Sequence, residues 1–128
     1  MKKLFIIFIL LFSVMFSFNC FAKWEYLTTD INDNTFYLDY ERIRKVDNFI
    51  YFWVLTNSPS IDKFGELSAI YYREGDCKLF RDRDLEVRGF TKSMGKGIMK
   101  QYKPETTEFE TPFPNTVNER ILNVICNR

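Results

Sequence analysis

The stretch Phe49-Ile50-Tyr51-Phe52-Trp53-Val54-Leu55 decides the fold, because apolar and aromatic residues follow one another there without a break. The run is too short to span a membrane as a helix, which takes about 20 residues. Aromatic and β-branched side chains are typical of β-strands, and apolar side chains at every position indicate a strand covered on both faces. We therefore predict a central strand, which the rest of the chain has to cover.

Shorter segments around this stretch also have strand patterns. We predict further strands over 24–28, 35–39, 67–73 and 77–90, joined by turns rich in Asp, Asn, Gly and Pro. Within the last of these, strict alternation places Arg81 and Arg83 on the core side together with Cys77, so we expect these arginines at an edge or a bend. The segment 91–103 is rich in Gly and Lys, and 105–110 fits one last short strand.

The carboxy-terminal segment predicts a helix. Thr116-Val117-Asn118-Glu119 matches the capping box, in which the first and fourth side chains bond each other's backbone N–H groups. Val117, Ile121 and Ile125 then recur at helical spacing. A helix of about three turns is too short to be stable alone, so it has to pack on the sheet.

The first 22 residues have the features of a secretory signal peptide. Lys2 and Lys3 precede an apolar segment over 4–18, and Ala22 stands directly before the charged Lys23. We predict cleavage after Ala22, which leaves one domain over 23–128 in the periplasm or on the cell surface. In the rival interpretation Cys20 is the lipid-attachment residue of a lipoprotein, although Asn19 stands where a small residue is expected.

Charge and composition exclude several function classes. The chain has 18 basic and 17 acidic residues, and removal of Lys2 and Lys3 leaves 16 against 17, a net charge of −1. A nucleic-acid binder would normally have a basic excess. The chain has no histidine, so it lacks the commonest general base and the commonest metal ligand.

Two cysteines remain after the predicted cleavage, Cys77 and Cys126. In an oxidising compartment an even count favours a disulfide, and only one pairing is available. Such a bridge would hold the carboxy-terminal helix to the sheet. The alternative is two separate buried thiols.

Several patterns suggest ligand sites weakly. Asp30-x-Asn32-x-Asn34 resembles a calcium loop, but Thr35 stands where that loop needs Gly, so we predict a hairpin turn. Gly95-Lys96-Gly97 lacks the spacing of a phosphate loop. We predict a basic patch that could bind an acidic partner surface or an anionic glycan, formed by Lys92, Lys96, Lys100 and Lys103. We expect no catalytic residues, no metal and no cofactor.

Five segments follow one another in a characteristic order: Phe36–Arg44, Trp53–Asn57, Asp76-Cys77, Met94–Gly97 and Val124-Ile125-Cys126. This order resembles the surface-adhesin protein E-like family of bacteria, and the resemblance covers roughly residues 24–126. It implies a single antiparallel sheet of about six strands, mostly β within the α+β class, with a carboxy-terminal helix held by a disulfide. It also implies a surface protein that attaches bacteria to host matrix.

We therefore expect an exported, non-enzymatic domain that binds a protein partner, such as an extracellular-matrix protein, through one face or edge of its sheet. An edge could also join two copies into a homodimer. We expect no nucleic-acid partner, and membrane contact only through the signal segment or lipidation at Cys20. The alternative is a periplasmic carrier of a small apolar or aromatic ligand, with a groove lined by tyrosines such as Tyr26, Tyr37, Tyr51, Tyr71 or Tyr72. A small enzyme with a carboxylate or lysine site is a third hypothesis.

Overall fold

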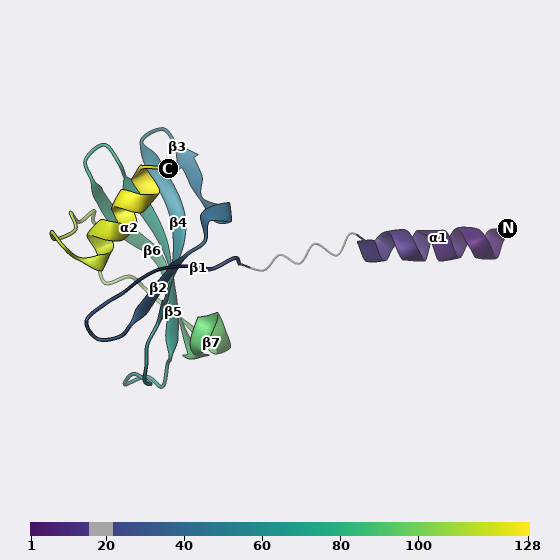
Figure 1. Ribbon diagram of the computed structural model, residues 1–128, viewed down its shortest axis with the longest axis horizontal. Coiled ribbons are helices and arrows are strands. Elements are labelled where there is room, and N and C mark those ends of the chain that lie inside the picture. The colour runs from purple at the N-terminus through teal and green to yellow at the C-terminus, as the bar shows by residue number, and fades with distance from the viewer. Residues whose placement is uncertain (16–21) are drawn as a thin grey trace.

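An antiparallel sheet in the order β1-β2-β4-β5-β6-β7 forms the body of the molecule, with the short β3 paired to β4 (Figure 1). The computed structural model describes residues 1–15 and 22–128, and within them the sheet has seven strands. The elements are α1 (Lys2–Met15), β1 (Glu25–Thr29), β2 (Thr35–Leu38), the 3-10 helix η1 (Tyr40–Arg42), β3 (Arg44–Val46), β4 (Phe49–Asn57), β5 (Ser68–Asp76), β6 (Arg81–Lys92), the 3-10 helix η2 (Ser93–Gly95), β7 (Lys96–Tyr102) and α2 (Val117–Cys126). The predicted α+β fold with a mostly β, antiparallel sheet is confirmed. Strands β3 and β7 were not predicted, and the strand predicted over 105–110 does not form.

The run that begins at Phe49 is the central strand, β4, as predicted. It pairs with β5 along its whole length and with β2 and β3 on its other side. Ile50, Phe52 and Val54 are buried, whereas the residues between them, Tyr51 and Trp53, are only half-buried. The strand therefore sends Ile50, Phe52 and Val54 to one face and Tyr51, Trp53 and Leu55 to the other, where Leu55 is also buried.

Helix α2 covers the face to which Phe52 points (Figure 1). Ile121, Leu122 and Ile125 are at most 1% exposed, and they complete the core with side chains from β2 and β4. Half of the predicted capping box is present, because the Oγ1 atom of Thr116 accepts a hydrogen bond of 3.3 Å from the Glu119 N–H. The Glu119 carboxylate accepts at 3.2 Å from the N–H of Asn115, one residue before the expected partner Thr116. Amphipathic spacing and the cap thus place this helix as the sequence indicated.

The predicted disulfide joins the helix to the sheet. The Cys77–Cys126 bridge links the residue after β5 to the last residue of α2, over a sequence separation of 49. The Cys77 N–H also donates to the Asn48 carbonyl at 3.1 Å, which fixes the bridge beside the start of β4. The end of the chain is therefore anchored covalently to the middle of the sheet.

The predicted strand over 77–90 is wrong in its start and in its faces. Strand β5 continues to Asp76, the turn occupies 77–80, and β6 starts at Arg81. The register shifts between Tyr72 and Arg73, where the extra residue on β6 is Leu85. A β-bulge of this kind reverses the alternation. Arg81 and Arg83 consequently lie on the face opposite α2, not on the core side.

Two further segments also differ from the prediction. The Gly- and Lys-rich segment forms β7, which pairs with β6 from Val87 to Lys92. Instead of a strand, 105–110 contributes a single bridge between Glu110 and Asp82. The segment 103–116 thus runs from the end of β7, along the first half of β6, to the start of α2.

Helix α1 contains most of the apolar segment of the predicted signal peptide. In the described part of the chain, no helix has the length and apolar character that crossing a membrane requires. Cys20, the residue of the lipidation hypothesis, lies outside the described residues. Cleavage after Ala22 and a domain over 23–128 remain predictions.

Candidate binding surfaces

The sheet face opposite α2 carries a cluster of aromatic rings and guanidinium groups. We call it the aromatic–arginine face, and its residues are Trp24, Arg42, Arg44, Tyr51, Trp53, Tyr72 and Arg88. At its centre the rings of Trp53 and Tyr72 stack with centroids 4.5 Å apart and an angle of 27° between their planes. The guanidinium groups of Arg42 and Arg88 lie 5.1 and 5.6 Å from the Trp53 ring centroid.

Local structure fixes these cations in place. Arg42 ends the 3-10 helix η1, whose cap residue Asp39 accepts from the Glu41 N–H and also pairs with Arg42 Nε at 2.5 Å. The same guanidinium lies 5.8 Å from the Trp24 ring. Arg88 pairs with Glu86 two positions before it on β6. Each cation–π contact contributes about 0.5–1 kcal/mol at an exposed site, so the contacts together favour this arrangement of the side chains.

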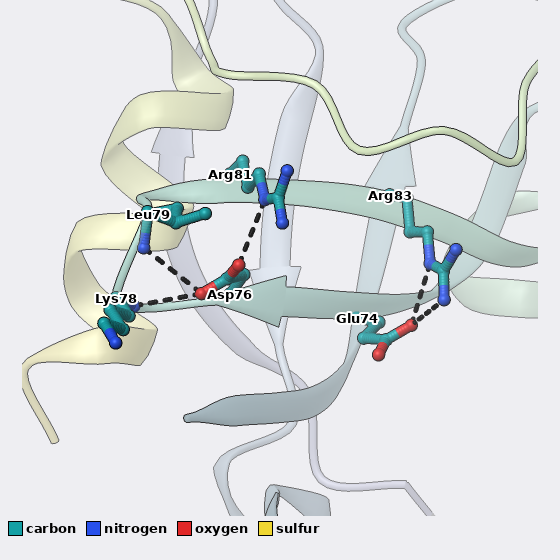
Figure 2. Close-up of polar contacts among 6 residues, drawn as sticks. All are labelled: Glu74, Asp76, Lys78, Leu79, Arg81 and Arg83. Carbon is teal, nitrogen blue, oxygen red and sulfur yellow. Dashed lines mark hydrogen bonds and ion pairs between the residues drawn. The ribbon is translucent and has the colours of Figure 1, made fainter. Parts of the chain in front are cut away.

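Two ion pairs extend this face toward the β5–β6 turn (Figure 2). Arg83 reaches Glu74 at 2.7 Å, and Arg81 reaches Asp76 at 3.0 Å. Burial alone would raise the pKa of Asp76. Hydrogen bonds from the Leu79 N–H, Arg81 and the Lys78 N–H outweigh it and hold that pKa below its ordinary value. The Asp76 carboxylate therefore ties together the turn that begins β6.

A groove lies on the other face of the sheet, beside the start of α2. It has a volume of about 1050 Å³. Its floor includes Ala69 and Tyr71 of β5 and Val87 and Gly89 of β6, and the segment 103–113 forms one wall. A volume near 1000 Å³ is at the upper end for ligand sites in proteins.

A buried ion-pair network lies at one end of the groove. Arg73 of β5 contacts Asp82 at 3.2 Å and Asp84 at 2.8 Å, and it donates to the side-chain oxygen of Asn118 in α2. The side chains of Arg73 and Asp82 are only 11% and 5% exposed. Burial and the neighbouring Asp84 raise the pKa of Asp82, against the opposing effect of Arg73. Two carboxylates thus share one guanidinium.

The opposite end of the groove is closed by Glu66 and Tyr102. The Tyr102 hydroxyl donates to Glu66, and this bond, together with burial, raises the pKa of Tyr102 to about 12. Glu66 lies over Gly89, where an added Cβ would come within 1.9 Å of its Oε2 atom. Only glycine at position 89 leaves room for this carboxylate.

The four lysines of the predicted basic patch are all exposed, but they do not form one compact cluster. Lys92 and Lys96 are cross-strand partners on the β6–β7 hairpin, and Lys100 pairs with Gly89 farther along it. Lys103 lines the groove. Binding of an acidic partner by these lysines stays a prediction.

The Asp30 turn is the hairpin turn that the sequence predicts. The Asp30 carboxylate accepts from the Asn34 side chain at 3.0 Å and from the backbone N–H groups of Asn32 and Asn34, both at 2.9 Å. The Asn34 side-chain bond is the largest cause of the lowered pKa of Asp30, which burial opposes. These oxygens are used in closing the β1–β2 turn.

Sequence reasoning missed the aromatic–arginine face, because it expected the strand over 49–55 to be covered on both faces. The face could have been recognised from the kinds of side chain that alternate along this strand. Tyr51 and Trp53 each have a polar atom, whereas Ile50, Phe52 and Val54 have none. Amphipathic rings at every second position of an apolar run indicate a face that is partly open to solvent.

Comparison with known proteins supports the fold. The model of the family described as surface-adhesin protein E matches residues 24–127. Crystal form II of Haemophilus influenzae protein E superposes with a TM-score of 0.64 at 17% identity, covering 85% of this chain and 91% of that one. The selenomethionine form of the same protein gives 0.62 at 19% identity over 80% and 85%, and protein E of non-typeable H. influenzae gives 0.59 at 14% over 86% and 79%. No curated protein matches the chain.

Proposed function

Given that the chain belongs to the surface-adhesin protein E family, we propose that it is an exported, non-enzymatic domain that docks a protein partner on its aromatic–arginine face. The supporting observation is Trp53, held between Arg42 and Arg88 on a face that α2 does not cover. Trp, Tyr and Arg are the residues most enriched among binding hot spots in protein interfaces. A rigid, half-exposed cluster of these three types loses little conformational entropy on binding.

The ionisable groups support a binding role over catalysis. The buried acids Asp76, Glu74 and Asp82 each pair with an arginine, so they serve to hold strands together. The chain has no histidine to act as a general base. We therefore place the activity in surface recognition.

The carrier hypothesis is less well supported. Of the tyrosines named in that hypothesis the groove includes only Tyr71, with Tyr102 in addition, and carboxylates line much of it, among them Asp84, Glu105 and Glu108. Charged walls fit a small apolar ligand poorly, because burying an unpaired charge is costly.

The test compares two double variants against a panel of immobilised extracellular-matrix proteins. Arg44→Ala/Arg88→Ala removes two guanidiniums from the aromatic–arginine face, and Lys78→Ala/Arg120→Ala removes two exposed cations elsewhere. We expect the first pair to weaken binding to the recognised matrix protein about tenfold or more and the second to leave it within about twofold. Equal losses would mean that net charge alone drives attachment.

A third variant separates this face from the predicted basic patch. Lys92→Ala/Lys96→Ala/Lys100→Ala/Lys103→Ala removes that patch and leaves the aromatic–arginine face intact. Loss of attachment in this variant alone would transfer the binding site to the β6–β7 hairpin.

Export and assembly have separate tests. We propose cleavage after Ala22. The intact mass of the protein from the bacterial envelope should then equal that of a chain that begins at Lys23, and acyl additions at Cys20 would contradict this.

We also propose that β7 is the edge through which two copies can pair, since Ile98 and Met99 are 78% and 48% exposed there. Light scattering on Ile98→Lys, compared with the unmodified protein, tests the dimer.

A further inference from the structure

The groove has an excess of negative charge that the chain as a whole lacks. Among the described residues its lining includes seven carboxylates, of Asp62, Glu66, Asp82, Asp84, Glu105, Glu108 and Glu110. Four cationic side chains also line it, of Lys63, Arg73, Arg83 and Lys103, which leaves an excess of three negative charges. The full sequence has a net charge of +1. The charge of the groove is therefore local.

Two of the four cations of the groove are engaged in ion pairs already. Arg73 is shared between Asp82 and Asp84, and Arg83 pairs with Glu74 on the other face. Asp82 is 4% exposed, and its Oδ2 atom contacts Arg73 without forming a hydrogen bond within the described part of the chain. Neither cation is therefore free to neutralise the exposed carboxylates of Glu105, Glu108 and Glu110, which leaves these available to a further positive charge.

The groove is long and has apolar contact sites. The floor from Asp82 to Gly89 follows β6 for about 20 Å at roughly 3.3 Å per residue. Phe64, 59% exposed, lies on the rim beside Tyr102, and Phe113, 80% exposed, lies on the rim before α2. An extended chain of about six residues has this length, and its side chains would alternate between the floor and the charged wall.

We propose that this groove binds an extended, positively charged peptide segment of a partner protein, with lysine or arginine side chains against the 105–110 wall and apolar side chains on the floor beside Tyr71 and Val87. The groove and the aromatic–arginine face lie on opposite sides of the sheet, so this site is additional to the one proposed above. It stands or falls independently of it.

The test uses labelled hexapeptides and fluorescence anisotropy with the protein purified after export. The probe alternates Lys and Leu, and the comparison peptides alternate Glu and Leu or Lys and Gly. We expect saturable binding of the Lys–Leu peptide only, weakened by salt, because the screening length falls from about 10 Å at 0.1 M to about 3 Å at 1 M. Equal binding of the Glu–Leu peptide, or no binding of the Lys–Leu peptide, would overturn the proposal.

Matched variants locate the site. Glu105→Gln/Glu108→Gln/Glu110→Gln neutralises the wall, and Glu25→Gln/Asp33→Asn/Asp47→Asn removes the same charge from exposed positions that do not line the groove. We expect about a tenfold loss of affinity in the first variant and less than about twofold in the second. Equal losses would mean attraction to overall charge and would refute a groove site.

Two further readouts settle the occupant and the face. Spermidine carries the same charge as the Lys–Leu peptide but has no apolar side chains, and we expect it to compete at least tenfold more weakly. Competition at equal concentration would assign the groove to small cations instead. In NMR spectra the Gly89 amide should shift on peptide binding and the Trp53 indole should not, and the reverse pattern would place the peptide on the aromatic–arginine face.

Discussion

Removal of the disulfide should act mainly on the unfolded chain. Cys77→Ala/Cys126→Ala opens a loop that spans a sequence separation of 49. The chain-entropy relation for a loop of this length gives a loss of about 4 kcal/mol at 25 °C. A domain of this size has a total stability of only about 5–15 kcal/mol, so the bridge accounts for much of it.

The native fold of that variant should survive, because the helix has its own apolar anchor. Ile121, Leu122 and Ile125 remain fully buried against the sheet without the bridge. Burial of each such side chain contributes about 1.5–3 kcal/mol. We therefore expect an unchanged far-ultraviolet circular dichroism spectrum and a melting temperature lower by roughly 15–30 °C.

The assay is urea unfolding of the exported protein, the double variant and the exported protein treated with a reductant. The variant and the reduced protein should lose stability equally, and both should show a slightly larger dependence on urea, because an unbridged unfolded chain exposes more surface. Leu122→Ala is the comparison that acts on the folded state, through a cavity that costs about 2–5 kcal/mol. A loss below 1 kcal/mol, or a smaller urea dependence with loss of helical signal, would refute the reasoning.

Three other perturbations test the local structure. Thr116→Ala removes the cap of α2 and should cost about 1 kcal/mol in urea unfolding, whereas Thr116→Ser should be nearly neutral. Glu66→Gln should bring the pKa of Tyr102 down from about 12 toward 10.0, measured from the tyrosinate absorbance. Because the pKa of Tyr102 is raised in the folded state, the Glu66–Tyr102 bond stabilises the folded protein fully below pH 10. This stabilisation is lost as the pH rises through about 12. Arg73→Ala leaves Asp82 buried without its cation and should cost about 3–5 kcal/mol at pH 7, less as the pH falls through the raised pKa of Asp82, and less again when combined with Asp82→Asn.

The main framework of the fold could be predicted from the sequence because strong local signals agree with one another there. The unbroken apolar run predicted a central strand, which is β4. The capping box and the helical spacing of apolar residues predicted a helix, which is α2. The disulfide followed from the count of cysteines in an exported chain, without any knowledge of their geometry. In each of these cases the short-range pattern and the tertiary structure demand the same element.

The parts that were missed depend on long-range pairing. Gly75 was assigned to a turn, yet it lies in β5, where an added Cβ would come within 3.0 Å of Ile50 and Leu122. Glycine is present there because the helix packs closely on the sheet, which a local pattern does not reveal. The Lys-rich β7 became a strand because β6 offered it an edge, although its own residues have weak strand propensity.

The bulge at Leu85 explains why each candidate surface has its own chemistry. Residues 81–84 alternate Arg and Asp, so a strand sends the arginines to one face and the aspartates to the other. Had the alternation continued through Leu85, Val87 would share a face with Arg83, and the apolar floor of the groove would be lost. The extra residue instead puts Arg88 with Arg83 on the aromatic–arginine face, and Val87 with Asp84 in the groove. One irregularity in one strand therefore adds the Arg88 guanidinium to one surface and the apolar Val87 to the other, so that the two surfaces can be altered by different substitutions on the same strand.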